Sequence, residues 1–205
     1  MVVSNDSLMF LVVLFAAALI ALFLVRAIVE RRLVELLGRG KIERFLSFSS
    51  SVVARALVPP FNLTFMRLNA FLMSGDAQEA AKTIEVLLAA KKSKAQEKEV
   101  LVKAYRFFLE QGDVKRAQEL FYQIQERCDA LDKKQAGILK DIFIDKRSGH
   151  IQAMQSILES NASGVAERFE AAYLLAVQYR NIGDSQRALL YERMASSLAH
   201  QPINQ

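Results

Sequence analysis

The chain has 205 residues, of which 52% are hydrophobic, and it carries 27 basic against 22 acidic side chains. This apolar content excludes a disordered chain, and the scarcity of Gly and Pro beside abundant Ala, Leu, Glu, Gln, Lys and Arg predicts an all-α protein. One cysteine and two histidines exclude a disulfide framework and a thiolate zinc cluster and leave little room for a histidine metal site. We therefore expect no metal and no cofactor.

The first predicted element is a membrane helix. Residues 8–25 read LMFLVVLFAAALIALFLV, without a charged or strongly polar side chain. A helix of this length is roughly 27 Å long, close to the hydrocarbon thickness of a bilayer. A buried core helix and a cleaved signal peptide are the alternatives, but no basic residue precedes the segment and no small-residue cleavage site follows it. We expect a permanent transmembrane anchor over residues 1–30.

Basic residues gather directly after this segment. Residues 26–55 carry seven basic and three acidic side chains, whereas residues 1–25 carry one acid and no base. The positive-inside rule then places the C-terminal side in the cytoplasm, in a single-pass protein of the plasma (bacterial inner) membrane. Anionic lipid explains such a cluster better than nucleic acid does. The side chains expected to face lipid are Arg26, Arg31, Arg32, Arg39, Lys41 and Arg44.

Residues 31–60 are expected to form a basic juxtamembrane connector. Apolar residues at helical spacing continue the first helix on one face, and Gly38 and Gly40 are expected to end it. These apolar residues are Val29, Leu33, Leu36 and Leu37. Residues 45–56 are apolar and Ser-rich; an interfacial or packing segment is favoured over a partner-binding one. Pro59-Pro60 is the expected domain boundary.

Internal repetition dominates the rest of the chain. Glycines recur at positions 75, 112, 149 and 183, and the first, second and fourth of them are followed by Asp. Gly permits the turn and Asp caps the next helix, with Asp76 and Glu79 forming a capping-box pattern. An aromatic residue and an Ala stand nine positions apart around each Gly-Asp pair, as Phe71/Ala80, Phe108/Ala117 and Tyr179/Ala188.

This pattern resembles the tetratricopeptide repeat (TPR), in which a small residue of the second helix packs against an aromatic residue of the first. The resemblance implies an α-solenoid of three to four helical hairpins over residues 61–205, since one hairpin alone cannot bury its apolar face. The match is weakest over residues 135–168. There Asp141 and Asp145 replace apolar residues and Met154 replaces the Ala, so this segment is either a degenerate repeat or a plain helical hairpin.

No catalytic motif is recognisable. The sequence contains no phosphate-binding glycine loop, zinc-protease motif or nucleophile elbow. Cys128 has no nearby His in sequence and is expected to be a packed thiol. His150 is expected at a helix cap, His200 lies in the tail, and Asp141 with Asp145 is typical of a solvated face. We expect no enzymatic activity.

Proteins of the TPR family generally bind peptides or partner helices in a concave groove lined by the first helix of each hairpin. The resemblance implies a groove lined by Phe65, Asn69, Val102, Arg106, Leu139, Lys140, Phe143, Tyr173, Val177 and Arg180. An aromatic and basic lining with few acids would favour a segment with apolar anchors and a carboxylate. The alternative is that Phe65, Leu139 and Val177 are ordinary core residues. Phe65 also stands where chaperone-binding members carry a clamp Lys, so that clamp is incomplete here.

The sequence therefore predicts a membrane-anchored TPR scaffold or adaptor that recruits a protein or peptide partner. One alternative is a periplasmic or lumenal assembly or quality-control factor for exported proteins. The other is a structural subunit of a membrane complex, in which the alanines at 16–18 would permit close contact between spans.

Overall fold

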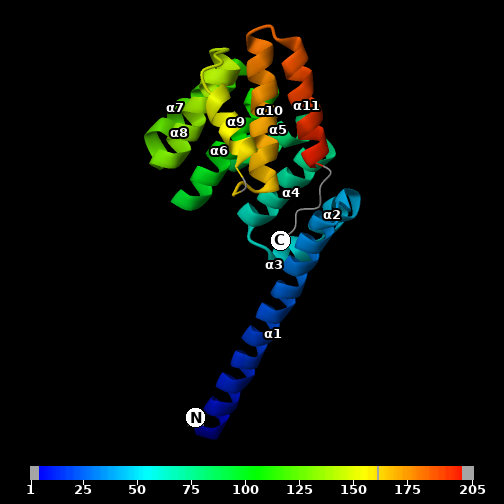
Figure 1. Cartoon of the computed structure of the whole chain (residues 1–205). Coiled ribbons are helices and arrows are strands. Elements are labelled where there is room, and N and C mark those ends of the chain that lie inside the picture. Colours follow the sequence, from blue (N-terminus) through cyan, green and yellow to red (C-terminus); the bar gives the residue numbers. More distant parts are fainter. Residues whose placement is uncertain (1–4, 161, 200–205) are drawn as a thin grey trace. The chain divides into compact units, whose positions relative to one another are not determined.

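The computed structural model of this protein describes residues 5–160 and 162–199, except for the side chains of residues 5–8 and 10–12. His200 lies outside the described residues. Every element in the described part of the chain is helical (Figure 1), which confirms the all-α prediction. The chain forms two compact units, residues 1–93 (unit 1) and residues 94–205 (unit 2).

Unit 1 begins with a long helix. Its helices are α1 (Asn5–Gly38), α2 (Ile42–Ser49), α3 (Val52–Leu57), α4 (Pro60–Ser74) and α5 (Ala77–Ala89). As predicted, α1 ends at Gly38, and Gly40 takes a left-handed φ of 66° in the turn that follows. Among the described residues one helix, over Val13–Gly38, is long and apolar enough to cross a membrane. Only 6% of its apolar window is buried, which distinguishes it from a core helix.

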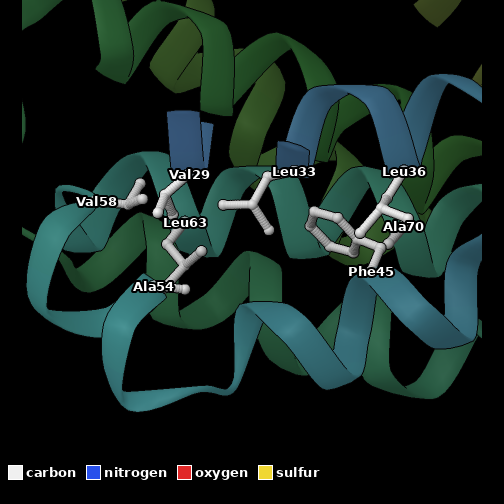
Figure 2. Close-up of a cluster of buried hydrophobic side chains, with 8 residues drawn as sticks. All are labelled: Val29, Leu33, Leu36, Phe45, Ala54, Val58, Leu63 and Ala70. Carbon is white, nitrogen blue, oxygen red and sulfur yellow. The ribbon is translucent and has the colours of Figure 1, made fainter. Parts of the chain in front are cut away.

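The connector residues build the core of unit 1. Val29, Leu33 and Leu36 of α1 are buried together, as their shared face predicts. Figure 2 shows two ends to this cluster: Ala54, Val58 and Leu63 lie around Val29, and Phe45 lies beside Leu36 and Ala70. Residues 45–56 therefore pack against α1 and α4, in agreement with the favoured packing role.

The proline pair lies inside unit 1, and the division between the two units falls after Ser93. Pro60 is the first residue of α4. A proline fits this position because the first helical N–H has no partner within the helix and the fixed φ of proline is already helical. The proline pair thus starts a helix within the unit.

Unit 2 consists of paired helices. They are α6 (Lys94–Glu110), α7 (Val114–Arg127), α8 (Ala130–Leu139), the π-helical turn η1 (Lys140–Ile144), α9 (Ile151–Glu159), α10 (Val165–Asn181) and α11 (Ser185–Ala199). Within this unit α6 packs against α7, and α10 packs against both α9 and α11.

The Gly-Asp pairs form the predicted turns. Gly75, Gly112 and Gly183 take left-handed φ values of 73°, 72° and 77°. The following residues, Asp76, Asp113 and Asp184, each accept a hydrogen bond from the backbone N–H three positions on, at 3.0–3.1 Å. These contacts confirm the glycine turn and the Asp cap at all three positions.

The capping box predicted at Asp76 is only half formed. The Asp76 carboxylate caps α5, but the backbone N–H of Asp76 donates to the carbonyl of Phe71. The Glu79 carboxylate instead pairs with Lys82, with 2.6 Å between Oε1 and Nζ. The reciprocal bond is lost because the glycine turn already satisfies the donor that Glu79 would have bonded.

The segment with the poorest repeat match contains the π-helical turn. Asp141 and Asp145 lie within and just after η1, where their carboxylates pair with Arg147 and Lys140 at 3.1 and 2.8 Å. His150 takes the N-cap position of α9, but its side chain makes no cap bond; its Nε2 lies 3.0 Å from Asp141. These acids therefore tie the turn together.

We expect Gly112→Ala to destabilise unit 2 by about 1–2 kcal/mol, the cost of placing an alanine in the left-handed region. A Cβ at this position would meet no atom within 4 Å, so backbone conformation alone carries the effect. The control is Gly149→Ala, which has equal space and no positive φ. Thermal unfolding of the full chain in nanodiscs measures both variants, and equal shifts in Tm would exclude the left-handed turn as the cause.

Candidate partner-binding cleft

Unit 2 contains an open cleft between α6, α8, η1, α9 and α10. It has two lobes of about 200 and 320 Å³. The lobes adjoin each other, since both are lined by Arg106, Leu139, Glu170 and Leu174. The first lobe is otherwise lined by Leu109, Glu110, Phe143, Ala166, Phe169 and Tyr173. The second is otherwise lined by Gln135, Ile138, Met154, Ile157, Glu167 and Ala171. The surface is largely apolar, with a few charged groups.

Helical spacing brings the polar and aromatic side chains to the cleft. Arg106 and Glu110 lie one turn apart on α6, and Glu170 and Tyr173 lie at i, i+3 on α10. The η1 turn supplies Phe143, whose ring centroid is 6.1 Å from that of Tyr173 at an interplanar angle of 34°. Two tilted rings therefore form part of the wall beside the carboxylates.

The charges of the cleft are unequal. Arg106 pairs with Glu170 across α6 and α10, with 2.7 Å between Nη1 and Oε1. The Glu167 carboxylate accepts a hydrogen bond from the backbone N–H of Gly164 at the start of α10. Glu110 makes no ion pair with any side chain in the described part of the chain. The described cleft thus contains three carboxylates and one guanidinium, and of the three carboxylates only that of Glu170 is paired with a cation.

The apolar surroundings affect the titration of this site. Desolvation by the neighbouring cleft residues raises the pKa of the Glu110 carboxyl, against the smaller opposing effect of Arg106. Burial also raises the pKa of the Tyr173 hydroxyl, and the nearby negative charge of Glu110 adds to that effect. Glu110 is exposed as a residue, so its carboxylate is accessible to a cation, and a bound cation would oppose the desolvation that raises its pKa.

Four of the predicted groove residues meet in this cleft: Arg106, Leu139, Phe143 and Tyr173. Lys140 pairs with Asp145 and lies 5.9 Å from the centroid of the Phe121 ring. Arg180 pairs with Glu192. Neither of these two cations lines either lobe.

The remaining predicted groove residues do not line the cleft. Val102 is half-buried, and Val177 is buried in the core of unit 2, as the alternative prediction allowed. Phe65 and Asn69 are half-buried residues of unit 1, where Phe65 stacks on Phe61 with ring centroids 5.9 Å apart. The residues that the resemblance implied are thus only partly brought together.

The charge of the cleft lining differs from the expected one. A lining with few acids was expected, but Glu110, Glu167 and Glu170 outnumber Arg106. These acids were not predicted because the resemblance to the TPR family supplies only single groove positions from each repeat. Helical spacing could have predicted two of these acids on the groove side of their helices, since Glu110 is four residues after Arg106 and Glu170 is three residues before Tyr173. The cleft lining therefore carries more acidic than basic side chains.

The residues considered for catalysis lie elsewhere. Cys128 is the C-cap residue that follows α7 and is buried, and desolvation raises the pKa of its thiol. The backbone N–H of His150 donates to the amide of Gln178, which is completely buried. Among the residues that the structure describes, no group of three or more His, Cys, Asp or Glu side chains could hold a metal ion.

The basic juxtamembrane residues form a second candidate site. Arg26 pairs with Glu30, and both Arg32 and Arg39 pair with Glu35, at 2.9–3.4 Å. Among the described basic residues between positions 26 and 55, the exposed side chains without an ion pair are those of Arg31, Lys41, Arg44 and Arg55. Free basic charge is therefore available on α1, α2 and α3.

We expect Glu110→Gln to stabilise unit 2 at pH 7, because the folded state raises the pKa of this carboxyl and so disfavours its ionised form. The stabilisation should disappear at pH 3, where the parent side chain is protonated. Urea unfolding between pH 3 and pH 8 measures the difference, with Glu126→Gln on the exposed face of α7 as control. A pH-independent difference would assign the effect to packing.

Comparison with known proteins finds no counterpart for this cleft. No family model matches the chain, and no curated protein or solved structure matches it.

Proposed function

We propose that this chain is a membrane-anchored, TPR-like adaptor that holds a protein partner at the membrane through the cleft of unit 2. The capped Gly-Asp turns and the paired helices α6/α7 and α10/α11 support a repeat architecture. The exposed apolar helix over Val13–Gly38 supports the anchor. Anchoring raises the effective concentration of the partner at the membrane without any new contact. The role is binding, without a catalytic step.

The partner segment is a helix or extended strand with apolar anchors and a basic side chain. The observation that carries this assignment is the Glu110 carboxylate, which lies in a partly apolar lobe and has no cation. A Lys or Arg side chain would pair with Glu110 and contact the rings of Phe143 and Tyr173, which adds a cation–π attraction. Leu109 and Phe169 supply apolar surface in the same lobe.

Peptide binding to the full chain in nanodiscs tests this chemistry. The probes are fluorescein-labelled helical peptides with two Leu anchors four positions apart, identical except for Arg, Gln or Glu at one position between them. Fluorescence anisotropy should give an affinity for the Arg peptide about tenfold above that for the Glu peptide, the effect of about 1.4 kcal/mol. Equal affinity for the three peptides would overturn the proposal.

A charge reversal at Glu110 tests whether the preference for the Arg peptide arises in the cleft. Glu110→Lys should abolish the preference for Arg or invert it. The matched control is Glu126→Lys, which makes the same change in net charge on the exposed face of α7 and outside both lobes. If the two variants weaken Arg-peptide binding equally, the preference reflects overall charge and the cleft is not the site.

We place unit 2 on the cytoplasmic side of the plasma membrane because basic residues follow the apolar helix. Protease treatment of spheroplasts that carry a C-terminal epitope tag tests the orientation, with detergent-permeabilised cells as control. A tag that survives until permeabilisation supports the cytoplasmic adaptor. Immediate loss of the tag would favour the periplasmic or lumenal assembly factor.

A further inference from the structure

The junction between α1 and the rest of unit 1 fixes where a bilayer would end. α1 continues without a break from Asn5 to Gly38. The uncharged run ends at Val25, and the first charged layer is the pair Arg26–Glu30 at 2.9 Å. Each later residue rises a further 1.5 Å or so along the helix axis. Positions on α1 therefore measure distance from the hydrocarbon.

α3 packs on α1 close to this boundary. Ala54 and Val58 lie around Val29, the first buried residue among the described side chains of α1 (Figure 2). Val29 is four residues beyond Val25, hence about 6 Å from the hydrocarbon edge. The headgroup layer is about 5–8 Å thick on each side of the bilayer. α3 is thus placed at headgroup depth.

α3 is apolar on its exposed side. Val52 and Val53 are 82% and 50% exposed, which is costly in water for two adjacent branched side chains. Arg55 is exposed in the next turn and makes no ion pair in the described part of the chain. An apolar edge with a free guanidinium matches the boundary between acyl chains and phosphates, where apolar groups are buried and basic ones meet anionic headgroups.

α2 lies farther from the boundary. Its buried residue Phe45 packs beside Leu36, which is eleven residues beyond Val25 and about 16 Å from the hydrocarbon. Arg39 and Lys41 follow beyond the same end of α1. Attraction to lipid charge decays over about 8 Å at physiological salt, so these cations lie outside its range.

We infer that α3 is a second membrane contact: Val52 and Val53 enter the headgroup–acyl boundary of the leaflet, and Arg55, with Arg31, binds the phosphates of anionic lipids. This inference rests on the proposed membrane anchor. Among the basic residues of unit 1, the inference assigns lipid binding to Arg55 and Arg31 and no longer to Arg39, Lys41 and Arg44. The contact also restrains rotation of unit 1 about the axis of the span.

Depth-dependent fluorescence quenching tests the inference with the full chain in liposomes. Single cysteines replace Val52, Val53, Lys41, Met73 or Leu19 in a Cys128→Ala background, and each carries an NBD fluorophore. Lipids with a doxyl group at carbon 5 of the acyl chain quench a fluorophore near the headgroups. We expect strong quenching from Val52 and Val53 and little from Lys41 or from Met73, an exposed residue of α4.

Leu19 separates the two proposals, since it lies within the apolar run of α1 and is exposed. If lipids with a doxyl group at carbon 12 do not quench a label at Leu19, the anchor fails and the inference fails with it. If Leu19 is quenched but Val52 and Val53 are not, the anchor stands and the inference alone is overturned. Quenching at Lys41 equal to that at Val52 would overturn the assigned depth.

Lipid charge tests the role of Arg55. In liposomes with 30% phosphatidylglycerol, Arg55→Gln should lower the ratio of lipid-bound to lipid-free α3 about fivefold. Lys41→Gln, the matched loss of charge, should leave this ratio unchanged. Equal effects of both variants, or no effect of Arg55→Gln, would overturn the phosphate contact.

Discussion

Phe45→Ala should lower the free energy of unfolding of unit 1 by about 3–5 kcal/mol, the cost of truncating a buried phenylalanine. The Phe45 ring is completely buried and lies beside Leu36 and Ala70 (Figure 2). It is the one large apolar side chain that α2 buries completely, since Ser49 is the other residue buried in this helix. A helix of eight residues is unstable by itself. Loss of the ring should therefore detach α2 from α1.

Hydrogen exchange of the full chain in nanodiscs measures this effect helix by helix. Phe45→Ala should remove the protection of amides in α2 and leave that of α10 unchanged. Met73→Ala is the control, because it truncates a similarly large side chain that is 56% exposed in the same unit. Equal loss of protection in the two variants would show that burial of Phe45 does not hold α2 in place.

Local signals in the sequence predicted the turns and helix ends correctly. Gly112 with Asp113 specifies a left-handed residue and a capping oxygen, and both requirements involve only a few neighbouring residues. The end of α1 at Gly38 and the buried face of Val29 and Leu33 follow from spacing alone. Such features were predictable because a few adjacent residues determine them without reference to the rest of the fold.

Features that depend on distant contacts were harder to predict. The π-helical turn at Lys140–Ile144 has no simple local signal. Asn181, 39 residues away, donates a hydrogen bond from its amide to the carbonyl of Ile142 in that turn. The charge of the cleft was also mispredicted, because the pairing of Arg106 with Glu170 joins two helices that are far apart in sequence. Repeat patterns specify the small and large positions of a hairpin, but not the charge of the surface it presents.

Residues 45–56 were predicted as an interfacial or packing segment, and the structure divides this region between two short helices, α2 and α3. Ser51 accepts a hydrogen bond from the backbone N–H of Ala54, and this N-cap is a local signal for α3. α3 has only six residues, so its stability depends on Ala54 and Val58 packing against α1. The same packing determines where Val52 and Val53 lie, which is why the depth of α3 along α1 could be inferred only from the structure, although an interfacial role for residues 45–56 was among the predictions.

Ala117→Leu should destabilise unit 2 by about 1–3 kcal/mol, because it adds three heavy atoms to a filled site. Ala117 is completely buried, on α7 where this helix packs against α6. It stands nine residues after Phe108, as Ala188 stands nine after Tyr179, and these four side chains are all buried. The repeat pattern requires a small residue here so that the paired helices approach closely.

Urea unfolding of the full chain in nanodiscs measures this cost. Lys115→Leu is the matched control, since it introduces the same side chain at an exposed position of α7 and should change stability by less than about 0.5 kcal/mol. Ala188→Leu should reproduce the Ala117→Leu effect on the α10/α11 pair, because the repeat assigns both alanines the same position. If Ala117→Leu is tolerated like Lys115→Leu, α6 and α7 do not require a small residue at this position, and the assigned repeat register is wrong.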